Sequence, residues 1–337
     1  MSAAATVVGG GSTAAPPPVE RLQRAARRNA WTLGLVGVLA VMLAFTKIIQ
    51  PNYGPAQIQG LAIGVLPVAF AAIAQAIIVI SGGIDLSVAS IMSLTGVTAA
   101  VLLDGQGDGV AILLVLGVLA LGLLVGAVNG SLIVVTRVPD IVVTLAMSFV
   151  WAGTTLLVLD SPGGGSVSWL QELVNGSFLS AWVPRAFLLL AVIVLVIWLP
   201  LRRSMLGLSM YALGSSRLAA FRSGVPVGRT KIAAYAIGGL FCAFGGLAIN
   251  AATGSGSPVP GPYTLQSVAA VVLGGVSLAG GRGGIVGPIV ACVILQLVRT
   301  DLTLLGVSPN LSTAIQGLIL ISVVLVGSVI SMRRVRR

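Results

Sequence analysis

The sequence predicts an all-α membrane protein, a polytopic bundle of about ten transmembrane helices, some of them broken at glycine-rich turns. Three observations predict this fold. The 337 residues are 57% hydrophobic and only 8% charged, whereas a soluble domain carries roughly 25% charged residues. Apolar stretches of the length that spans a bilayer recur along the chain. Basic residues gather at the ends of those stretches, as membrane topology requires.

The chain divides into a transmembrane domain and two short basic tails. Residues 1–29 contain three consecutive prolines and four arginines, which predicts a disordered cytoplasmic tail. A signal peptide fits poorly, because the following apolar run is too long and no small-residue cleavage site ends it. Residues 30–331 form the transmembrane domain, in which 202–231 is a hydrophilic cytoplasmic loop, and residues 332–337 are a second basic cytoplasmic tail.

Ten apolar segments are candidate spans, and each is close to the roughly 17 to 25 residues that cross a bilayer. They are 31–49, 58–80, 87–103, 110–135, 140–159, 184–201, 231–252, 266–280, 284–299 and 311–331. The eighth and ninth are short and glycine-rich, so eight spans with a re-entrant pair are the alternative.

The distribution of charge tests this count. With the N-terminal tail in the cytoplasm and alternating spans, the inside receives all of the 19 basic residues except Lys47, Arg185 and Arg299. The outside receives most of the eight acidic residues, namely Asp104, Asp108, Asp160, Glu172 and Asp301. Removing one middle span would place the later basic clusters outside. The positive-inside rule therefore favours an even number of spans with both termini cytoplasmic.

The composition excludes several classes of function. Histidine is absent, which excludes His-based nucleophile pairs, zinc and haem sites, and proton relays. The lysines, Lys47 and Lys231, each follow a threonine, so the chain has no P-loop and any ATP must be bound by another chain. Cys242 and Cys292 lie in apolar runs and are expected in the core. The net charge of +11 reflects topology rather than nucleic-acid binding, and no cofactor or metal site is expected.

The segment 80–90 (Ile-Ser-Gly-Gly-Ile-Asp-Leu-Ser-Val-Ala-Ser) is the first with functional character. Gly82 and Gly83 end one helix, and the side-chain oxygens of Asp85 and Ser87 are expected to cap the next. A carboxylate near membrane depth is costly unless it is capped, paired or hydrated. Two compatible interpretations follow. The segment is a helix cap at a cytoplasmic turn, and it holds a broken helix in place at the cytoplasmic end of the pathway.

A second segment, 272–284, echoes the first at an offset of 192 residues. Gly274 and Gly275 correspond to the first glycine pair, and Ser277 and Arg282 are expected to organise this turn at the inner gate. Internal duplication and chance similarity of glycine-rich sequence are both left open. The segment lacks the lysine and the preceding strand of a phosphate-binding loop, which excludes nucleotide binding.

The loop 202–231 contains a short amphipathic helix. Ser216 is expected to cap it, and Gly224 is suited to end it. Two readings stay open: a surface helix on anionic membrane lipid, or a docking helix for a soluble partner with an apolar anchor and a basic rim. The residues expected to contact such a partner are Ser216, Arg217, Leu218, Ala219, Phe221, Arg222 and Gly224.

Polar side chains inside the spans are the candidates for a solute pathway. They are Gln75, Asn129, Thr144, Ser148 and Asn250. Amides and hydroxyls suit a neutral, polyol-like solute, although each also serves as an ordinary hydrogen bond between helices.

Four motifs together resemble the permease subunits of ribose/xylose/galactose-type ABC sugar importers. The first is Ser81-Gly-Gly-Ile-Asp-Leu-Ser87, and the second is Asn129-Gly130 followed by Arg137-Val-Pro-Asp-Ile-Val-Val-Thr-Leu145. The third is Tyr211-Ala-Leu-Gly-Ser-Ser-Arg-Leu-Ala-Ala-Phe-Arg-Ser-Gly-Val225, and the fourth is Ala269 to Gly283. The chain departs from the family pattern at Thr264, where glutamate is usual, and at Ser215-Ser216, where Gly-Asn is usual.

The resemblance implies a homodimer with one central pathway in the bacterial inner membrane. It implies ATP-binding subunits docked on segment 204–224 and an external sugar-binding protein that delivers a pentose, hexose or related polyol. ATP-driven closure of the ATP-binding subunits would push the docking helices and reorient the transmembrane bundle. This chain itself would perform no covalent chemistry. The resemblance also implies that the choice of a particular sugar resides mostly in the binding protein.

Two other functions agree less well with these residues. A stand-alone secondary transporter or channel for a small polar solute would carry acids or histidine within its spans, and here only Asp85 and Asp140 lie near the membrane. An intramembrane hydrolase using these two carboxylates is disfavoured, because both have cap-like contexts at predicted turns.

Overall fold

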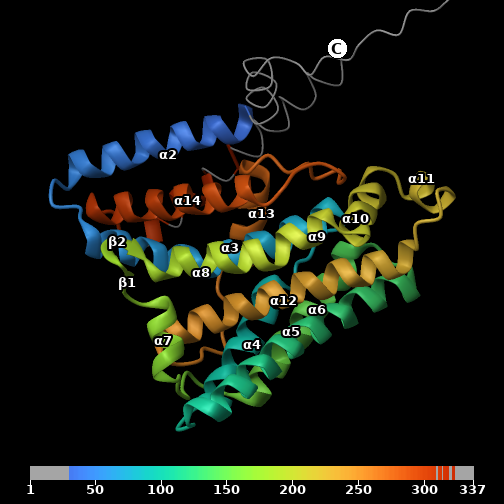
Figure 1. The fold of residues 1–337 in the computed structure, drawn as a ribbon, viewed down its shortest axis with the longest axis horizontal. Coiled ribbons are helices and arrows are strands. Elements are labelled where there is room, and N and C mark those ends of the chain that lie inside the picture. The colour runs from blue at the N-terminus through green and yellow to red at the C-terminus, as the bar shows by residue number, and fades with distance from the viewer. Residues whose placement is uncertain (1–29, 309, 313, 319–320, 323–337) are drawn as a thin grey trace, which may run out of the picture.

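The computed structural model describes residues 30–308, 310–312, 314–318 and 321–322. Nearly all of its regular structure is helical (Figure 1). The helices are α2 Ala30–Ile49, α3 Pro55–Ile80, α4 Val88–Leu103, α5 Asp108–Thr136, α6 Asp140–Val158, α7 Ser168–Val174, α8 Arg185–Ile193, the π-helical turn η1 Val194–Trp198, α9 Leu199–Arg203, α10 Met205–Ser215, α11 Arg217–Arg222, α12 Val227–Thr253, α13 Tyr263–Leu273 and α14 Val286–Leu304. A small antiparallel hairpin, β1 Ser177–Phe178 and β2 Ser180–Pro184, is the only sheet in the described part of the chain.

Seven helical stretches of the described chain are long and apolar enough to cross a membrane. They are α2, α3, α5, α6, the continuous run Arg185–Arg203, α12 and α14. The apolar helices α4 and α13 are shorter. Helices thus occupy nine of the ten predicted segments, while most of the tenth and both basic tails lie outside the described residues.

The predicted segment 266–280 is wrong at its C-terminal end, because α13 ends at Leu273. Gly275 adopts φ 79°, a left-handed conformation that glycine reaches without steric cost and that terminates a helix. Gly280 and Gly281 also have positive φ. The glycines at the end of the predicted segment therefore form an irregular turn.

The connections between the helices gather at two opposite ends of the bundle (Figure 1). We call them the α11 end, with connections 81–87, 137–139, 204–226 and 274–285, and the hairpin end, with connections 50–54, 104–107, 159–184 and 254–262. A hydrogen bond from Gly281 N to Ile80 O joins two turns at the α11 end, and Gly163 pairs with Gly256 at the hairpin end.

The central helix of the bundle is α3, whose residues from Leu61 to Ile80 are almost all buried and, except for Gln75, apolar or glycine. A helix without a polar face is stable only when other helices surround it, and α8, α12, α13 and α14 pack around α3. By contrast α2 is largely exposed apolar surface. Such a surface is compatible with lipid, not with water.

Helices α5 and α12 approach each other closely through glycine. A Cβ atom added to Gly122 would lie 2.6 Å from Gly239 O, and one added to Gly126 would lie 2.9 Å from the carbonyl carbon of Tyr235. Small residues four positions apart allow such backbone contact, which drives helix association in lipid. The abundance of glycine thus has a structural role along this interface.

Charge divides between the two ends as the predicted alternation requires. The α11 end carries most of the basic residues of the described chain, namely Arg137, Arg202, Arg203, Arg217, Arg222, Arg229, Lys231 and Arg282. The hairpin end carries Lys47, Arg185 and Arg299 together with Asp104, Asp108, Asp160, Glu172 and Asp301.

Candidate functional site at the α11 end

Helix α11 is a short, exposed helix that projects at one end of the bundle (Figure 1). Ser216 caps it as predicted, since its hydroxyl accepts a hydrogen bond from Ala219 N (3.3 Å). Gly224 follows the helix with φ 80°, and its N–H donates to Phe221 O. Leu218 is 61% exposed and Phe221 is 69% exposed. Two large apolar side chains exposed on a polar loop are typical of the anchor residues of a protein interface.

The helix before α11 packs directly on both glycine-rich turns. A Cβ atom on Gly214 of α10 would overlap the Ile80 carbonyl oxygen and lie 2.5 Å from Gly281 N. A Cβ atom on Gly82 would lie 3.3 Å from the Cα atom of Gly214. Backbone thus meets backbone with no intervening side chain. A displacement of α10 and α11 would reach both turns at once.

The first turn, Ser81–Ser87, ends α3 through Gly82, which has φ 79°. The Gly82 and Gly83 N–H groups donate to Val79 O and Ile78 O, which satisfies two carbonyl groups at the helix end. Asp85 is buried, and its Oδ1 accepts from Ser87 N (2.7 Å) and from the Ser87 hydroxyl (2.6 Å). The carboxylate therefore orders the turn itself.

The expected cap of α4 by Ser87 is wrong, because the Ser87 side chain makes no capping bond to the helix. Its hydroxyl donates to Asp85 instead, and Thr264 of α13 supplies the missing acceptor to Ala89 N (3.0 Å). The residue that departs from the family pattern thus caps a helix far from it in sequence.

A buried polar network holds the first turn to α5 and α6. The Asn129 amide donates to the Ser87 hydroxyl (2.8 Å), and the Trp151 indole donates to Asn129 Oδ1 (3.0 Å). Asn129 is fully buried, so each of these bonds replaces one to water that it has lost. Asn129 was predicted as a pathway residue, and its observed bonds are structural.

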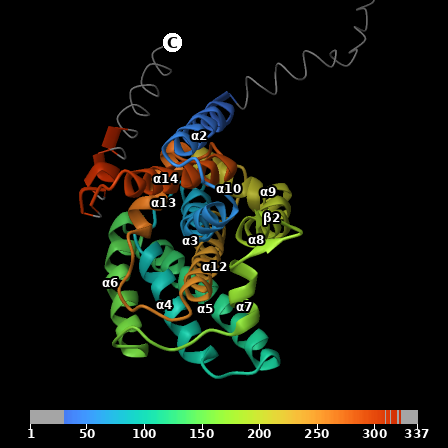
Figure 2. The ribbon, with the colours of Figure 1, turned by 90° about the vertical axis from the view of Figure 1, so that its left-hand side faces the viewer.

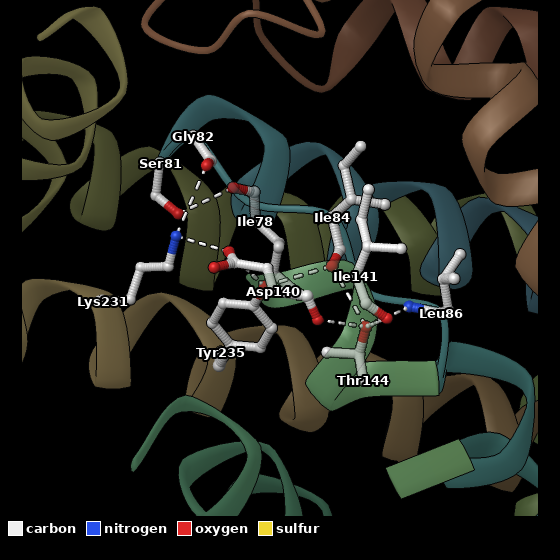
Figure 3. Close-up of polar contacts among 10 residues, drawn as sticks. All are labelled: Ile78, Ser81, Gly82, Ile84, Leu86, Asp140, Ile141, Thr144, Lys231 and Tyr235. Carbon is white, nitrogen blue, oxygen red and sulfur yellow. Dashed lines mark hydrogen bonds and ion pairs between the residues drawn. The ribbon is translucent and has the colours of Figure 1, made fainter. Parts of the chain in front are cut away.

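An ion pair lies beside this turn (Figure 3). Lys231 at the start of α12 pairs with Asp140 at the start of α6, and its Nζ also lies 3.5 Å from Gly82 O. The Tyr235 hydroxyl donates to Asp140 Oδ2 (2.8 Å) and lies 3.3 Å from Ile84 O. A Cβ atom on Gly83 would strike both Asp140 and Tyr235. The ion pair and the close packing against Gly83 thus hold the turn between α6 and α12.

Thr144, a second predicted pathway residue, belongs to the same cluster (Figure 3). Its hydroxyl accepts from Leu86 N (3.1 Å) and donates to Asp140 O (2.9 Å) within α6. The carbonyl oxygen of Ile84 lies 3.4 Å from it. Thr144 therefore positions the turn between α3 and α4.

The second turn, between α13 and α14, is partly exposed and is held mainly by backbone hydrogen bonds. Ser277 N donates to Arg282 O (3.1 Å), and Gly280 N donates to Ser277 O (2.9 Å). The Arg282 side chain is exposed. Two side chains reach the backbone at the ends of the turn: the Trp31 indole donates to Leu273 O (2.8 Å), and the Tyr211 hydroxyl donates to Gly283 O (2.9 Å).

The two turns share one helix-ending geometry, in a register one residue different from the predicted one. Gly275 N donates to Val272 O and Val276 N to Val271 O, as Gly82 and Gly83 do in α3. Gly82 and Gly275 are the glycines with positive φ, so Gly82 corresponds to Gly275 and not to Gly274. The sequence comparison matched the first glycine of each Gly-Gly pair, whereas the backbone conformations match one residue later.

The remaining predicted pathway residues lie away from this cluster. Gln75 is buried in α3, and both polar atoms of its side chain have no hydrogen-bond partner among the described residues. Ser148 donates only within α6, to Leu145 O. Asn250 lies toward the hairpin end of α12, where its amide donates to Gly165 O (3.0 Å).

Sequence reasoning missed Gly214, Lys231, Tyr235 and Trp151. Lys231 and Tyr235 are four residues apart at the start of an apolar helix, a spacing that puts them on one face. That spacing, and the rarity of lysine in this chain, are the signals that could have identified the pair. Nothing in the local sequence distinguishes Gly214 from the other glycines.

The described residues contain no cluster of three or more His, Cys, Asp or Glu side chains that could hold a metal ion. Both cysteines are buried and free, in agreement with the prediction that they are core residues.

Comparison with known proteins decides the family. The family described as branched-chain amino acid transport system / permease component matches residues 57–324. The chain belongs to this family. It is a permease subunit of the ABC transporter class and not a catalytic subunit.

Curated relatives cover most of this permease. The ribose import permease protein RbsC of Escherichia coli K12 is 32% identical over 88% of this chain and 94% of its own length. The Bacillus subtilis protein of the same name is 33% identical over 85% and 89%. The autoinducer 2 import system permease protein LsrD of Escherichia coli HS is 31% identical over 91% and 94%. No solved structure matches the permease.

Proposed function

We propose that the chain is the transmembrane subunit of an ATP-driven importer that moves a simple sugar, a pentose, hexose or related polyol, into the bacterial cytoplasm. The named relatives import ribose or autoinducer 2. The observation that carries the coupling part of the proposal is the exposed, capped α11 with Leu218 and Phe221, attached through Gly214 to both glycine-rich turns.

The proposed assembly contains two copies of this chain, two ATP-binding subunits and an external sugar-binding protein. The α11 end faces the cytoplasm, because it carries the basic residues. The predicted count of ten spans would place both termini on that side. The absence of a P-loop in the sequence requires the separate ATP-binding subunit.

The coupling step follows from the contacts of α10. The ATP-binding subunits bind α11 through Leu218 and Phe221, with Arg217 and Arg222 at the rim. When these subunits close, α10 moves with α11 and displaces both turns, because Gly214 contacts the backbone of both. The turns end α3 and α13, so these helices reorient around the pathway.

Substitution of Phe221 tests this function. Phe221→Asp should leave the chain inserted in the membrane but uncouple ATP hydrolysis from sugar uptake, because a charge replaces the apolar anchor. Phe221→Leu is the matched control and should retain uptake. The measurement is uptake of labelled sugar in cells that express the whole assembly. Normal uptake by Phe221→Asp, or uptake that persists without any ATP-binding subunit, would contradict the proposal.

A further inference from the structure

Segment 254–262, which joins α12 to α13, enters the membrane without forming a helix. Its Gly256 lies against Ala100 near the hairpin end of α4. Just beyond its other end, Thr264 accepts a hydrogen bond from Ala89 N (3.0 Å) at the start of α4. A helix rises about 16 Å between Ala100 and Ala89, roughly half of the 30 Å hydrocarbon core. The segment therefore runs from the hairpin end to the middle of the membrane.

From Ser257 onward, the backbone N–H groups of this segment have no hydrogen-bond partner among the described residues. Every second residue from 258 to 262 is proline, which prevents a helix and removes the N–H group at that position. The other N–H groups, those of Ser257, Val259 and Gly261, form no hydrogen bond within the described structure. Hydrocarbon offers no partner to such groups, so contact with lipid would be strongly unfavourable.

The chain itself does not bury this part of the backbone. Ser257 is exposed, and the Val259 side chain is 71% exposed. The surface beside the segment is hollowed, and the hollow is lined in part by Ser93, Ser255 and Ser257. Irregular backbone at membrane depth is tolerated only where protein buries it or where it lines a water-filled cavity. The exposed face of the segment must therefore meet water or a further protein chain.

The opposite side of the bundle has a similarly exposed surface of a different kind. Seen from the hairpin end, segment 254–262 lies on the side of α6 and α13, whereas α8 and α9 lie on the other side (Figure 2). Val196, in the middle of the continuous helical run Arg185–Arg203, is 66% exposed. A helix bonds its own backbone N–H groups, so lipid can cover this surface without leaving them unpaired. The two sides thus differ in their backbone rather than in their exposure.

We propose that segment 254–262 lines the central pathway and that a second copy of this chain supplies the opposite wall. The inference rests on the proposed two-copy assembly and assigns one face of the bundle to its interior. One copy alone leaves the segment open, so the pathway is incomplete without the partner copy. A two-fold axis through the pathway would bring the same segment of the partner opposite to it. The side formed by α8 and α9 then faces lipid.

Reaction of a thiol with a charged maleimide tests which face meets water. Val259→Cys and Val196→Cys are matched variants, because both replace a valine of similar exposure within the membrane, and the native Cys242 and Cys292 are buried. A charged reagent is costly to place in hydrocarbon, so in the complete assembly the Val259→Cys variant should react at least about tenfold faster than the Val196→Cys variant. Ser257→Cys is a second variant of the segment and should react as Val259→Cys does. Equal rates on the two sides, or faster reaction of the Val196→Cys variant, would overturn the inference.

Cross-linking tests what stands opposite the segment. A long, flexible bis-maleimide should join two copies of the Val259→Cys variant into a covalent dimer, because the two-fold axis brings the same residue of both copies to the pathway. The Val196→Cys variant should remain a single chain under the same conditions. If neither the Val259→Cys variant nor the Ser257→Cys variant gives a covalent dimer, a second copy does not supply the opposite wall and the inference is overturned.

Transport separates this inference from the proposed function. In the complete assembly, modification of the Val259→Cys variant by a bulky maleimide should abolish sugar uptake, because the adduct fills the pathway, whereas treatment of the Val196→Cys variant should leave uptake unchanged. If the unmodified assembly imports no sugar, the proposed function fails. If it imports sugar and the modified Val259→Cys assembly imports equally well, the pathway inference alone fails.

Discussion

The two glycine-rich turns that contact α10 end their helices in the same way but are held differently. The first, Ser81–Ser87, is mostly buried and is anchored by side chains of α5, α6 and α12. The second, between Leu273 and Val286, is more exposed than the first and is held mainly by backbone hydrogen bonds. Side-chain anchors fix a turn in one arrangement, whereas a more exposed turn bonded through its backbone has fewer contacts to break. In the proposed coupling step we therefore expect the second turn to move more than the first.

The largest effect is expected from a substitution that separates both turns from α10. Gly214→Val should destabilise the chain by about 3 kcal/mol and abolish uptake, because a Cβ atom there overlaps Ile80 O. Gly284→Ala is the control, since nothing lies within 4 Å of its added Cβ, and should change stability by less than about 0.5 kcal/mol. Thermal unfolding in detergent measures both, and equal midpoints would contradict the close contact.

The ion pair sharpens the account of the first turn. Asp140→Ala should cost about 2 kcal/mol, because it leaves the Lys231 ammonium without its partner in a mostly buried position. The double variant Asp140→Asn with Lys231→Met should cost less than Asp140→Ala alone. Thermal unfolding of these variants checks this order. In the double-mutant cycle of Asp140→Asn, Lys231→Met and the combined variant, purely additive changes in unfolding free energy would show that the two side chains are not coupled.

The buried network gives a smaller effect. Asn129→Ala should destabilise by about 1 to 2 kcal/mol, since it removes the partner of Ser87 and of Trp151. Ser148→Ala removes a hydroxyl bonded only within its own helix and should change stability by under about 0.5 kcal/mol. Chemical unfolding of the two purified variants compares them, and a larger loss for Ser148→Ala would refute the structural role of Asn129.

The smallest effect is expected in the second turn. Arg282→Ala should leave stability within about 0.5 kcal/mol of the parent and leave uptake unchanged, because the turn is bonded through the carbonyl oxygen of Arg282 and its side chain is exposed. Unfolding midpoints together with sugar uptake provide the check. A loss as large as that of Asn129→Ala would remove the distinction between the turns.

Much of the fold could be predicted from the length of the apolar runs and the placement of basic residues. The thickness of the bilayer sets the first, and the positive-inside rule sets the second. The cap of α11 by Ser216 and its end at Gly224 were also predicted, because both depend on local sequence. The end of α13 was predicted only in part. Gly274 and Gly275 were expected at a break in a helix, but the apolar segment was extended to residue 280, because the apolar run continues beyond the glycines.

The sequence predicted which segments form the candidate site but not which residues of other helices contact them. Thr264 caps α4 across a separation of 175 residues, and Lys231 pairs with Asp140 from another helix. Such partners depend on how helices pack, which hydrophobic periodicity does not specify. The same holds for Asn129, whose buried amide has a role only because Ser87 and Trp151 lie beside it.

The most direct test of the central claim is the accessibility of a thiol introduced on α11. The Leu218→Cys variant, with Ser180→Cys as the opposite-end control, is treated with a membrane-impermeant maleimide in intact and in permeabilised cells. The account predicts that the Leu218→Cys variant reacts only after permeabilisation and is protected when the ATP-binding subunit is co-expressed, whereas the Ser180→Cys variant reacts in intact cells. Reaction of the Leu218→Cys variant in intact cells would contradict the cytoplasmic placement of α11 and with it the proposed coupling.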